Sequence, residues 1–568
     1  MTAPSVPSLP QRSVRFATAR FSACVTVCII YACAGLTTAS LPAAEKTCQL
    51  AYSTYLGGAA RWDQARDICV DAAGNAYVTG GTTSVDFPTT PGAFDRSYNQ
   101  GGKDIGSGGH CDVFVSKFDP GGKLLWSTYL GGPNYDRGYG IKVDAAGFVY
   151  VCGRAGPEFP VTTGAFQPTF RGIDAGIYGQ NNGFVARLKP DGSALVWASY
   201  VGTGSLCRDF DLDAQGNVFT HLACESAPRA GEPELPTAWF AHTFQSTRPG
   251  GRDNGVIKIA ADGASVLWAT WLGGSDDEQK EACVRVDAEG RPCLLFWTKS
   301  ADIATTPGAY DRKYHGGQDA YLVKVNADGR SLQWATYFGG PGDSGGCSTH
   351  NLALDSAGNA VISQDTTVDD LPVTTGALQT KFGGGKTDAL VARFDAMGNL
   401  VASTLLGGLR EEGFDGISVD RAGRVYVTGQ SNSDDFPCTA DAFQSAPGGD
   451  NDAVLVLLHP DLSRLIYSTR LGGAKWDYGR AGCLGANGDL YITGSSAGAG
   501  WPTRNPWQAN FAGGVGSCYE GGCGAGDVVL ARFARGGSEG RGRRGEVGGR
   551  INHRGTETEN AEADFRQN

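Results

Sequence analysis

A six-residue phrase recurs seven times along the chain and constrains its fold more than any other feature. The phrase first reads Ser-Thr-Tyr-Leu-Gly-Gly at residues 53–58 and last reads Ser-Thr-Arg-Leu-Gly-Gly at residues 468–473. Its other copies begin at positions 127, 198, 269, 335 and 403, so the spacing is always 65 to 74 residues. A period this regular predicts a single repeat architecture rather than a series of unrelated domains.

Each repeat contains two further phrases that predict short strands joined by tight turns. In the first, at residues 70–78, Asp-x-x-Gly-Asn lies between two alternating apolar runs, and this pattern favours a hairpin turn because Gly and Asn tolerate positive φ. The second, at residues 112–121, reads as a strand that ends in a Pro-Gly turn. One period therefore holds four short antiparallel strands, which is the content of a β-propeller blade.

The two ends of the repeat array predict that the ring closes on itself. The array opens with a lone fourth strand at residues 50–56 and finishes on a lone third strand at residues 528–533. If the first strand completes the last blade, neither edge remains unpaired. We therefore predict an all-β fold, a seven-bladed β-propeller with four antiparallel strands per blade, closed by its N-terminal strand.

The three phrases resemble the SBBP repeat, a bacterial β-propeller repeat. The resemblance is carried by Val-Asp-x-x-Gly-Asn-x-Tyr-Val-Thr-Gly, by Asp-Phe-Pro-Thr-Thr-Pro-Gly-Ala-Phe at residues 86–94 and by Ser-Thr-Tyr-Leu-Gly-Gly, and it spans residues 49–535. It implies a secreted or surface propeller and supplies no catalytic residue. The third repeat departs most from the pattern, because Thr203 replaces the second glycine and its proline loop is altered at residues 235–240.

The N-terminal segment predicts export from the cell. Three arginines precede an apolar run at residues 21–36, and small residues follow it, as in a secretory signal peptide. The run is short and interrupted for a membrane span. We predict a signal peptide at residues 1–44, the propeller at residues 45–535 and a disordered polar tail at residues 536–568. The mature protein is then expected to be secreted, extracellular or at the cell surface, with the periplasm as an alternative.

Charge and motif content narrow the classes of function. The formal net charge is −11 and no basic stripe is visible, which argues against a nucleic-acid partner. The sequence contains no His-Glu-x-x-His pair and no phosphate loop. We therefore assign no catalytic residue, expect no cofactor other than a Ca²⁺ ion and expect a monomer.

The loop after the Gly-Gly pair carries an acidic residue in six of the seven repeats. These acids are Asp63, Asp136, Asp277, Asp343, Glu412 and Asp477. Their recurrence favours a structural role, bonding to loop amides within each blade. The alternative is a ring of carboxylates at the channel mouth that holds Ca²⁺ or polar ligands, with Asp277, Asp343 and Glu412 as metal candidates. No loop has the alternating Asp-x-Asp-x-Asp spacing of a dedicated calcium site.

Aromatic residues accompany the acids in repeats seven, one and two, which ring closure makes neighbours. Aromatic faces beside carboxylates and guanidinium groups suit sugar recognition, whereas the alternative is packing between blades. The candidate ligand-binding residues are Arg61, Trp62, Asp63, Tyr135, Asp136, Arg137, Trp476, Asp477 and Tyr478.

Two cysteine pairs are candidate disulfides in an oxidising compartment. Cys207 and Cys224 are predicted to face each other across a hairpin, and Cys518 and Cys523 bracket a Glu-Gly-Gly loop. Both pairs require Cα atoms roughly 4.4–6.8 Å apart.

The sequence as a whole favours a non-catalytic recognition scaffold. Its long loops share one face of the ring, where function is usually grafted onto a rigid fold. The expected partner is an extracellular glycan, another surface polymer or a surface protein. Two alternatives stay open: a carbohydrate-active hydrolase or lyase that uses acids at the channel mouth, and a protein–protein adhesion module.

Overall fold

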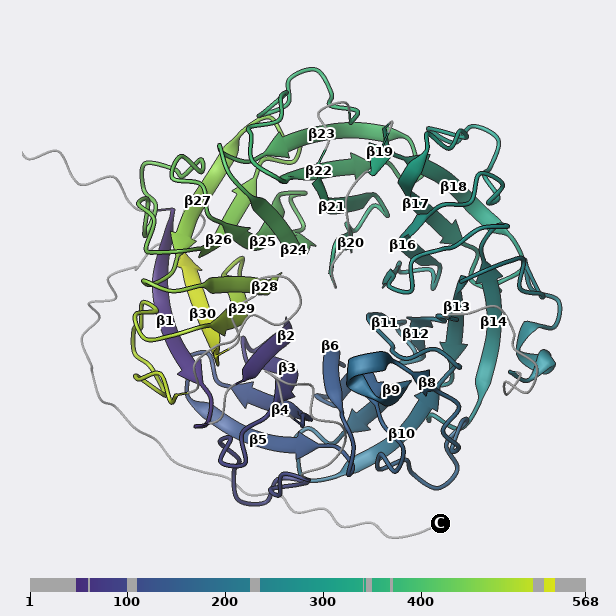
Figure 1. Ribbon diagram of the computed structural model, residues 1–568, viewed down its shortest axis with the longest axis horizontal. Helices are drawn as coiled ribbons and strands as arrows, with labels where there is room; N and C mark the ends of the chain where they lie inside the picture. Colours follow the sequence, from purple (N-terminus) through teal and green to yellow (C-terminus); the bar gives the residue numbers. More distant parts are fainter. Residues whose placement is uncertain are drawn as a thin grey trace, which may run out of the picture. The chain divides into compact units, whose positions relative to one another are not determined.

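Seven antiparallel sheets follow one another around a ring and form a seven-bladed β-propeller (Figure 1). The computed structural model describes residues 47–59, 62–99, 110–224, 235–340, 342–343, 350–367, 371–513 and 526–536. Within these residues the fold is built almost wholly of strands, and no helix is long and apolar enough to cross a bilayer. The predicted fold class is confirmed.

Each blade is a sheet of four main strands, ordered from the centre of the ring outward. Blade 1 contains β2 (Asp63–Val70), β3 (Ala76–Thr82), β4 (Asp112–Phe118) and β5 (Leu124–Leu130). Blade 2 contains β6 (Arg137–Val143), β7 (Val149–Ala155), β9 (Gln180–Leu188) and β10 (Leu195–Val201), with β8 (Ile173–Asp174) paired to β9 and the 3₁₀ turn η1 (Gly176–Tyr178) between them. Blade 3 contains β11 (Phe210–Leu212), β12 (Val218–His221), β13 (Asn254–Ile259) and β14 (Val266–Leu272), with η2 (Thr237–Phe240) in its long loop.

The remaining blades repeat this order. Blade 4 contains β15 (Cys283–Val286), β16 (Pro292–Thr298), β17 (Gly317–Val325) and β18 (Leu332–Phe338), with β19 (Gly342–Asp343) parallel to β17. Blade 5 contains β20 (Leu352–Leu354), β21 (Ala360–Thr366), β22 (Asp388–Phe394) and β23 (Leu400–Leu406). Blade 6 contains β24 (Glu412–Val419), β25 (Val425–Ser431), β26 (Asp452–Leu458) and β27 (Leu465–Leu471). Blade 7 contains β28 (Asp477–Leu484), β29 (Leu490–Ser496), β30 (Asp527–Arg535) and β1 (Cys48–Leu56).

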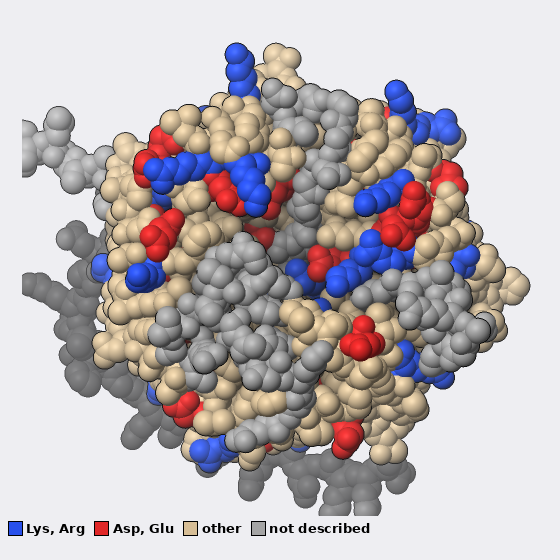
Figure 2. All heavy atoms as spheres, viewed as in Figure 1, with Lys and Arg blue, Asp and Glu red and all other residues tan. Residues whose placement is uncertain are grey.

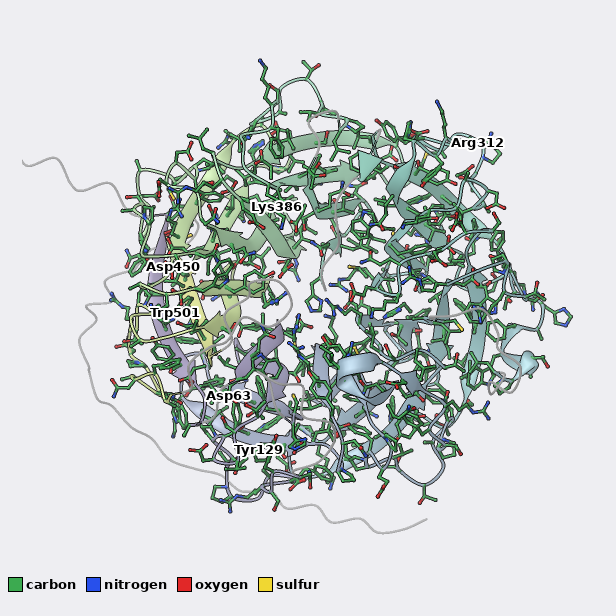
Figure 3. All side chains as sticks on the ribbon, viewed as in Figure 1. Asp63, Tyr129, Arg312, Lys386, Asp450 and Trp501 are labelled. Atoms are coloured by element: carbon green, nitrogen blue, oxygen red, sulfur yellow. The ribbon has the colours of Figure 1, made fainter. Side chains whose placement is uncertain are left out.

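The first and last strands of the chain close the ring, as the sequence predicted. Strand β1 pairs antiparallel with β30 from Leu56 opposite Val528 to Cys48 opposite Arg535. The side chain of Trp501, labelled beside β1 in Figure 3, donates to Ser53 Oγ at 2.7 Å and so fastens the long loop of blade 7 to the closing strand. Closure therefore leaves neither terminal strand with an open edge.

The inner hairpin turns show why Asp-x-x-Gly-Asn recurs. Asp71 Oδ1 accepts hydrogen bonds from the N–H groups of Ala73 and Asn75, and Gly74 adopts a φ of +85°. An L side chain at that φ would be strained, so glycine is required where the chain reverses.

A tryptophan on the outermost strand links four blades to the next. Trp126, Trp197, Trp268 and Trp334 each donate the indole N–H to a turn carbonyl of the following blade, at 3.0, 3.0, 3.2 and 3.0 Å. The apolar clusters also combine side chains of adjacent blades. These contacts hold adjacent blades together as one rigid frame.

Candidate functional site

A buried carboxylate ties the Gly-Gly loop to the start of the innermost strand in five blades. The N–H of Gly58 donates to Asp63 Oδ2 at 2.8 Å, and the N–H of Gly132 donates to Asp136 Oδ2 at 2.7 Å. The hydroxyl of Ser84 also donates to Asp63, at 2.9 Å (Asp63 is labelled in Figure 3). The five carboxylates are those of Asp63, Asp136, Glu278, Glu412 and Asp477, all buried. They bond to loop amides and hydroxyl groups within their own blades, which is the structural role that their recurrence favoured.

In blade 4 the buried acid is Glu278 and not the predicted Asp277. Glu278 Oε1 accepts from Thr298 and Ser300 at 2.9 and 2.7 Å, whereas the half-exposed Asp277 forms an ion pair with Arg252 at 3.2 Å. Glycine-to-acid spacing identifies the correct residue, because Asp136, Glu412 and Asp477 also follow the second glycine by four positions.

Asp277 and Glu412, the two metal candidates whose side chains the structure describes, are each engaged by other protein groups. Glu412 Oε2 accepts from the N–H of Gly408 at 2.8 Å and its Oε1 from Ser431 at 2.6 Å, so its oxygens are engaged by its own blade. The side chain of Asp343 lies outside the described residues. In the part of the chain that the structure describes, no three His, Cys, Asp or Glu side chains gather to hold a metal ion.

The predicted aromatic residues of blades 1 and 2 come together, but their rings are buried. Trp62 and Tyr135 are each 1% exposed and pack with Cys111 and Tyr178 in a small cluster of their own. The guanidinium group of Arg137 lies 4.4 Å from the centre of the Trp62 ring. Their role as ligand contacts stays a prediction, and the same holds for Arg61, which lies outside the described residues.

The candidate residues of blade 7 divide between two environments. Trp476 is half-buried, and its backbone carbonyl accepts from the N–H of Ala497 at 2.9 Å. Asp477 is buried and accepts from the N–H of Gly473 at 2.6 Å. Tyr478 stacks under Arg480, whose guanidinium carbon lies 3.9 Å from the ring centre. Blade 7 thus presents a second arginine–aromatic pair.

A β-bulge interrupts the innermost strand of four blades at the same place. The ladder skips one residue at Arg66 in β2, at Tyr139 in β6, at Asp415 in β24 and at Arg480 in β28. Each bulged residue follows the buried loop acid of its blade by three positions. Because a bulge turns a side chain away from the regular alternation, it can aim that residue at the axis of the ring.

The bulged residues belong to a ring of seven side chains, one from each blade, here called the central ring. Its members are Arg66, Tyr139, Arg208, Glu281, His350, Asp415 and Arg480. Five of them are buried, whereas the side chains of Arg208 and Glu281 are 12% and 18% exposed. Charged side chains of both signs gather near the centre of the long-loop face (Figure 2). The central ring is the candidate functional site, because it combines charge and burial with side chains that vary between blades.

Four arginines surround one tyrosine in the central ring. The guanidinium carbons of Arg208, Arg66, Arg137 and Arg154 lie 4.8, 5.4, 5.5 and 5.7 Å from the centre of the Tyr139 ring. Burial raises the pKa of the Tyr139 hydroxyl, but the positive charges of Arg154, Arg137, Arg66 and Arg208 outweigh it and lower the pKa to about 8. The surroundings of Tyr139 therefore favour negative charge.

Two ion pairs join four members of the central ring. Arg480 donates to Asp415 Oδ2 at 3.0 Å, and Arg208 lies 3.3 Å from Glu281 Oε1. Arg66 differs, since it is 3% exposed and forms no ion pair with the residues that the structure describes, and its buried Nε has no hydrogen-bond partner among them. Burial, together with the charges of Arg137 and Arg480, holds its pKa well below the usual range.

His350 bridges the axis next to this arginine cluster. Its Nε2 lies 3.1 Å from the carbonyl oxygen of Tyr139 and 3.5 Å from Asp67, while its Nδ1 lies 3.4 Å from Asp209. Lys142 pairs with Asp67 at 3.7 Å, and Arg285 pairs with Asp209 at 2.5 Å. The layer one position further along the strands is thus a network of paired charges, which gives the central ring a fixed floor.

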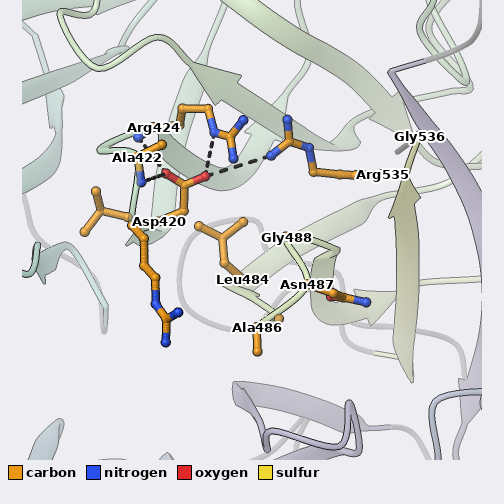
Figure 4. Close-up of a pocket in the computed structure, with 12 residues that line it drawn as sticks. Asp420, Ala422, Arg424, Leu484, Ala486, Asn487, Gly488, Arg535 and Gly536 are labelled. Carbon is orange, nitrogen blue, oxygen red and sulfur yellow. Dashed lines mark hydrogen bonds and ion pairs between the residues drawn. The ribbon is translucent and has the colours of Figure 1, made fainter. Parts of the chain in front are cut away.

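A separate pocket of about 600 Å³ lies between the hairpin turns of blades 6 and 7 (Figure 4). Asp420 is held there by Arg424 at 2.6 Å and by Arg535 at 3.9 Å, and its other oxygen accepts from the N–H of Ala422 at 2.9 Å. The Asp420 carboxylate is already bonded to groups that line the pocket, and turn backbone forms much of the pocket wall. The pocket therefore offers less specific chemistry than the central ring.

The predicted disulfide between Cys207 and Cys224 is wrong. The β11–β12 ladder ends at the pair Phe210–Thr220, and no disulfide joins Cys207 to Cys224. Cys207 Sγ instead lies 2.8 Å from the hydroxyl of Thr220. Cys518 and Cys523 lie outside the described residues.

Comparison with known proteins identifies the repeat family in parts of the chain. The SBBP beta-propeller repeat matches residues 51–88, 125–156 and 415–437, which confirms the resemblance in three regions of the chain. No curated protein matches the sequence.

Solved structures resemble the chain only loosely. The WD40 beta propeller domain of Doa1 is 10% identical, with 86% of this chain and 97% of that one covered and a TM-score of 0.40. Kuenenia stuttgartiensis hydrazine synthase is 9% identical (75% and 92% covered, TM-score 0.38), and quinohemoprotein alcohol dehydrogenase from Comamonas testosteroni is 11% identical (88% and 79% covered, TM-score 0.38). Similarity this low carries no argument about function.

Proposed function

We propose that the protein is a secreted or cell-surface propeller that binds a glycan or another surface polymer on its long-loop face and does not transform it. The predicted signal peptide at residues 1–44 supports export. The interblade bonds of Trp126 and its counterparts support a rigid scaffold, on which recognition needs little ordering of the protein.

The central ring is the observation that carries this proposal. Its side chains come from all seven blades, and their chemistry differs from blade to blade while the strands that present them repeat. The predicted ligand residues Trp62 and Arg137 stack against each other and join the arginine cluster around Tyr139. Polar groups that converge at the centre of a rigid fold are typical of a binding site.

The engagement of the acidic residues favours binding over glycoside cleavage. Hydrolysis needs two carboxyl groups that face a substrate, one as acid and one as base or nucleophile. The loop acids, such as Asp63 and Asp136, are buried and take hydrogen bonds from their own loops. In the central ring, Glu281 and Asp415 are occupied by Arg208 and Arg480.

A glycan array with product analysis tests the proposal. The purified protein is applied to a broad array, and the soluble fraction is assayed for new oligosaccharides by mass. Two variants run alongside: Arg66→Met, in the central ring, and Arg312→Met, which removes an exposed arginine near the rim of blade 4 (Figure 3).

We expect binding without new products, weakened in Arg66→Met and retained in Arg312→Met. New oligosaccharides would make the protein an enzyme and overturn the non-catalytic part of the proposal. Failure to bind any sugar would overturn glycan recognition and would favour the adhesion alternative.

A further inference from the structure

Arg66 is a buried cation that forms no ion pair with the described residues. It is 3% exposed, and its buried Nε has no hydrogen-bond partner among those residues. Taking an ionised group out of water is costly unless it is paired. A folded protein that keeps such a group at its centre therefore has a place for an anion that arrives from outside.

The positive charges around Arg66 further favour the binding of an anion. The guanidinium carbons of Arg208 and Arg66 lie 4.8 and 5.4 Å from the centre of the same Tyr139 ring, so two positive charges approach one aromatic side chain. Glu281 lies 3.3 Å from Arg208 and offsets part of that charge. Like charges this close repel each other in a poorly solvated site, and a shared anion would remove the repulsion.

The donors around Tyr139 suit an oxyanion. Guanidinium groups present several N–H donors in a planar fork that matches carboxylate, sulfate and phosphate oxygens. The Tyr139 hydroxyl can add a further hydrogen-bond donor. The layer of paired charges around His350 closes the site on the side of the hairpin turns.

From this geometry we infer that the central ring binds one oxyanionic group in the guanidinium cage formed by Arg66 and Arg208 over Tyr139. The inference rests on the proposed function for the nature of the whole ligand, and it makes that ligand an acidic polymer. A uronate carboxylate, a sulfate ester and a phosphate group share the required chemistry, and the experiment separates them.

The test measures thermal stability and binding of the full chain with small anions. Sodium glucuronate, sodium sulfate and sodium phosphate are titrated against glucose in chloride buffers of equal ionic strength. Sulfate and phosphate also stabilise proteins by exclusion from their surface, so each titration is repeated on Arg66→Met and Arg312→Met.

At least one of the three anions is expected to raise the melting temperature and to bind in the wild-type protein and in Arg312→Met. Arg66→Met should lose about tenfold or more in affinity, the effect of removing one charge-assisted hydrogen-bond donor. The anion that binds best identifies the source as a carboxylated, sulfated or phosphorylated ligand. Equal effects on Arg66→Met and the wild type, or no effect of any anion, would overturn the inference.

A second readout does not depend on any variant of Arg66. An anion in the cage offsets the positive charges that lower the Tyr139 pKa to about 8, so binding should move this titration to higher pH. Tyr139→Phe assigns the signal. An unchanged titration in saturating anion would contradict the inference.

The two proposals can fail separately. Binding of neutral glycans alone on the array, with no response to small anions, would leave the recognition scaffold standing and would remove the oxyanion site. Binding of small anions without binding to any glycan would support the oxyanion site and would overturn glycan recognition.

Discussion

Two positions on the same innermost strand behave in opposite ways. The loop acid at the start of the strand is Asp or Glu in five blades and is engaged each time by its own loop and neighbouring hydroxyl groups. The residue three positions later faces the axis and changes from Arg66 to Tyr139, Glu281, Asp415 and Arg480. The loop acid repeats and stabilises the blades, whereas the residue three positions later varies and contributes to the candidate site.

The bulge explains how one strand serves both purposes. The acid must lie in the ladder to reach the glycine amide, whereas the bulged residue leaves the ladder and is free to take any chemistry. Arg66 and Arg480 show the consequence, because the same kind of side chain is unpaired in blade 1 and bonded to Asp415 in blade 7.

The largest expected effect is a difference in the free energy of unfolding between variants of Arg480 and Arg66. Arg480→Met should lower the free energy of unfolding by about 3–5 kcal/mol, since it leaves the buried carboxylate of Asp415 without its partner. Arg66→Met should be neutral or stabilising by about 1 kcal/mol, because no partner is stranded. Denaturant titration measures both. Equal losses of stability in the two variants would show that Arg66 is paired, like Arg480, and would contradict the difference between the two arginines.

The next effect contrasts two adjacent acids in blade 4. Glu278→Ala should cost about 2–3 kcal/mol, because the hydroxyl groups of Thr298 and Ser300 lose their buried acceptor. Asp277→Ala removes a half-exposed ion pair with Arg252 and should cost less than about 1 kcal/mol. Denaturant titration compares the two variants. A larger loss of stability for Asp277→Ala would mean that Asp277, and not Glu278, has the structural role.

The frame should also become more stable as the pH falls from 8 to 5. Burial raises the pKa of Asp63, Glu278 and Asp477 to about 7, so between their unfolded pKa near 4 and pH 7 the folded state binds more protons than the unfolded state. Stability therefore falls as the pH rises through this window. His221, whose pKa burial lowers to about 4, opposes the trend as a single group.

Thermal unfolding at fixed ionic strength checks this trend. A melting temperature that rises from pH 5 to pH 8 would contradict the burial of the loop acids.

The smallest effect is spectroscopic and concerns the central ring alone. Tyr139 should ionise near pH 8, because the four guanidinium groups around it outweigh its burial, whereas a free tyrosine ionises near pH 10. Tyrosinate absorbance compared with Tyr139→Phe measures this directly. A difference spectrum that begins only near pH 10 would mean that the arginines do not surround the ring.

The sequence was sufficient for the fold and for the residues that repeat. Seven copies of one phrase predicted seven blades, and the unmatched strands at the two ends predicted the pairing of β1 with β30. The structural role of the loop acids followed from recurrence alone, although the count reached Asp277 instead of its neighbour Glu278.

The central ring could not be read from the sequence in the same way. Period-two alternation says which residues share a face of a strand, but a bulge breaks that alternation, and no local pattern marked Arg66 or Tyr139. The spacing of three residues after the loop acid is a usable signal only once the bulge is known. The Cys207–Cys224 pairing failed for another reason, because the β11–β12 ladder ends at Phe210–Thr220 and does not extend to either cysteine.

A crystal structure of the protein grown with the anion that binds best tests the central claim most directly. The account predicts an oxyanion within hydrogen-bond distance of Arg66, beside the Tyr139 ring, on strands that keep the bulges described here. An Arg66 side chain that instead pairs with a carboxylate of the protein, with no anion beside Tyr139, would contradict it.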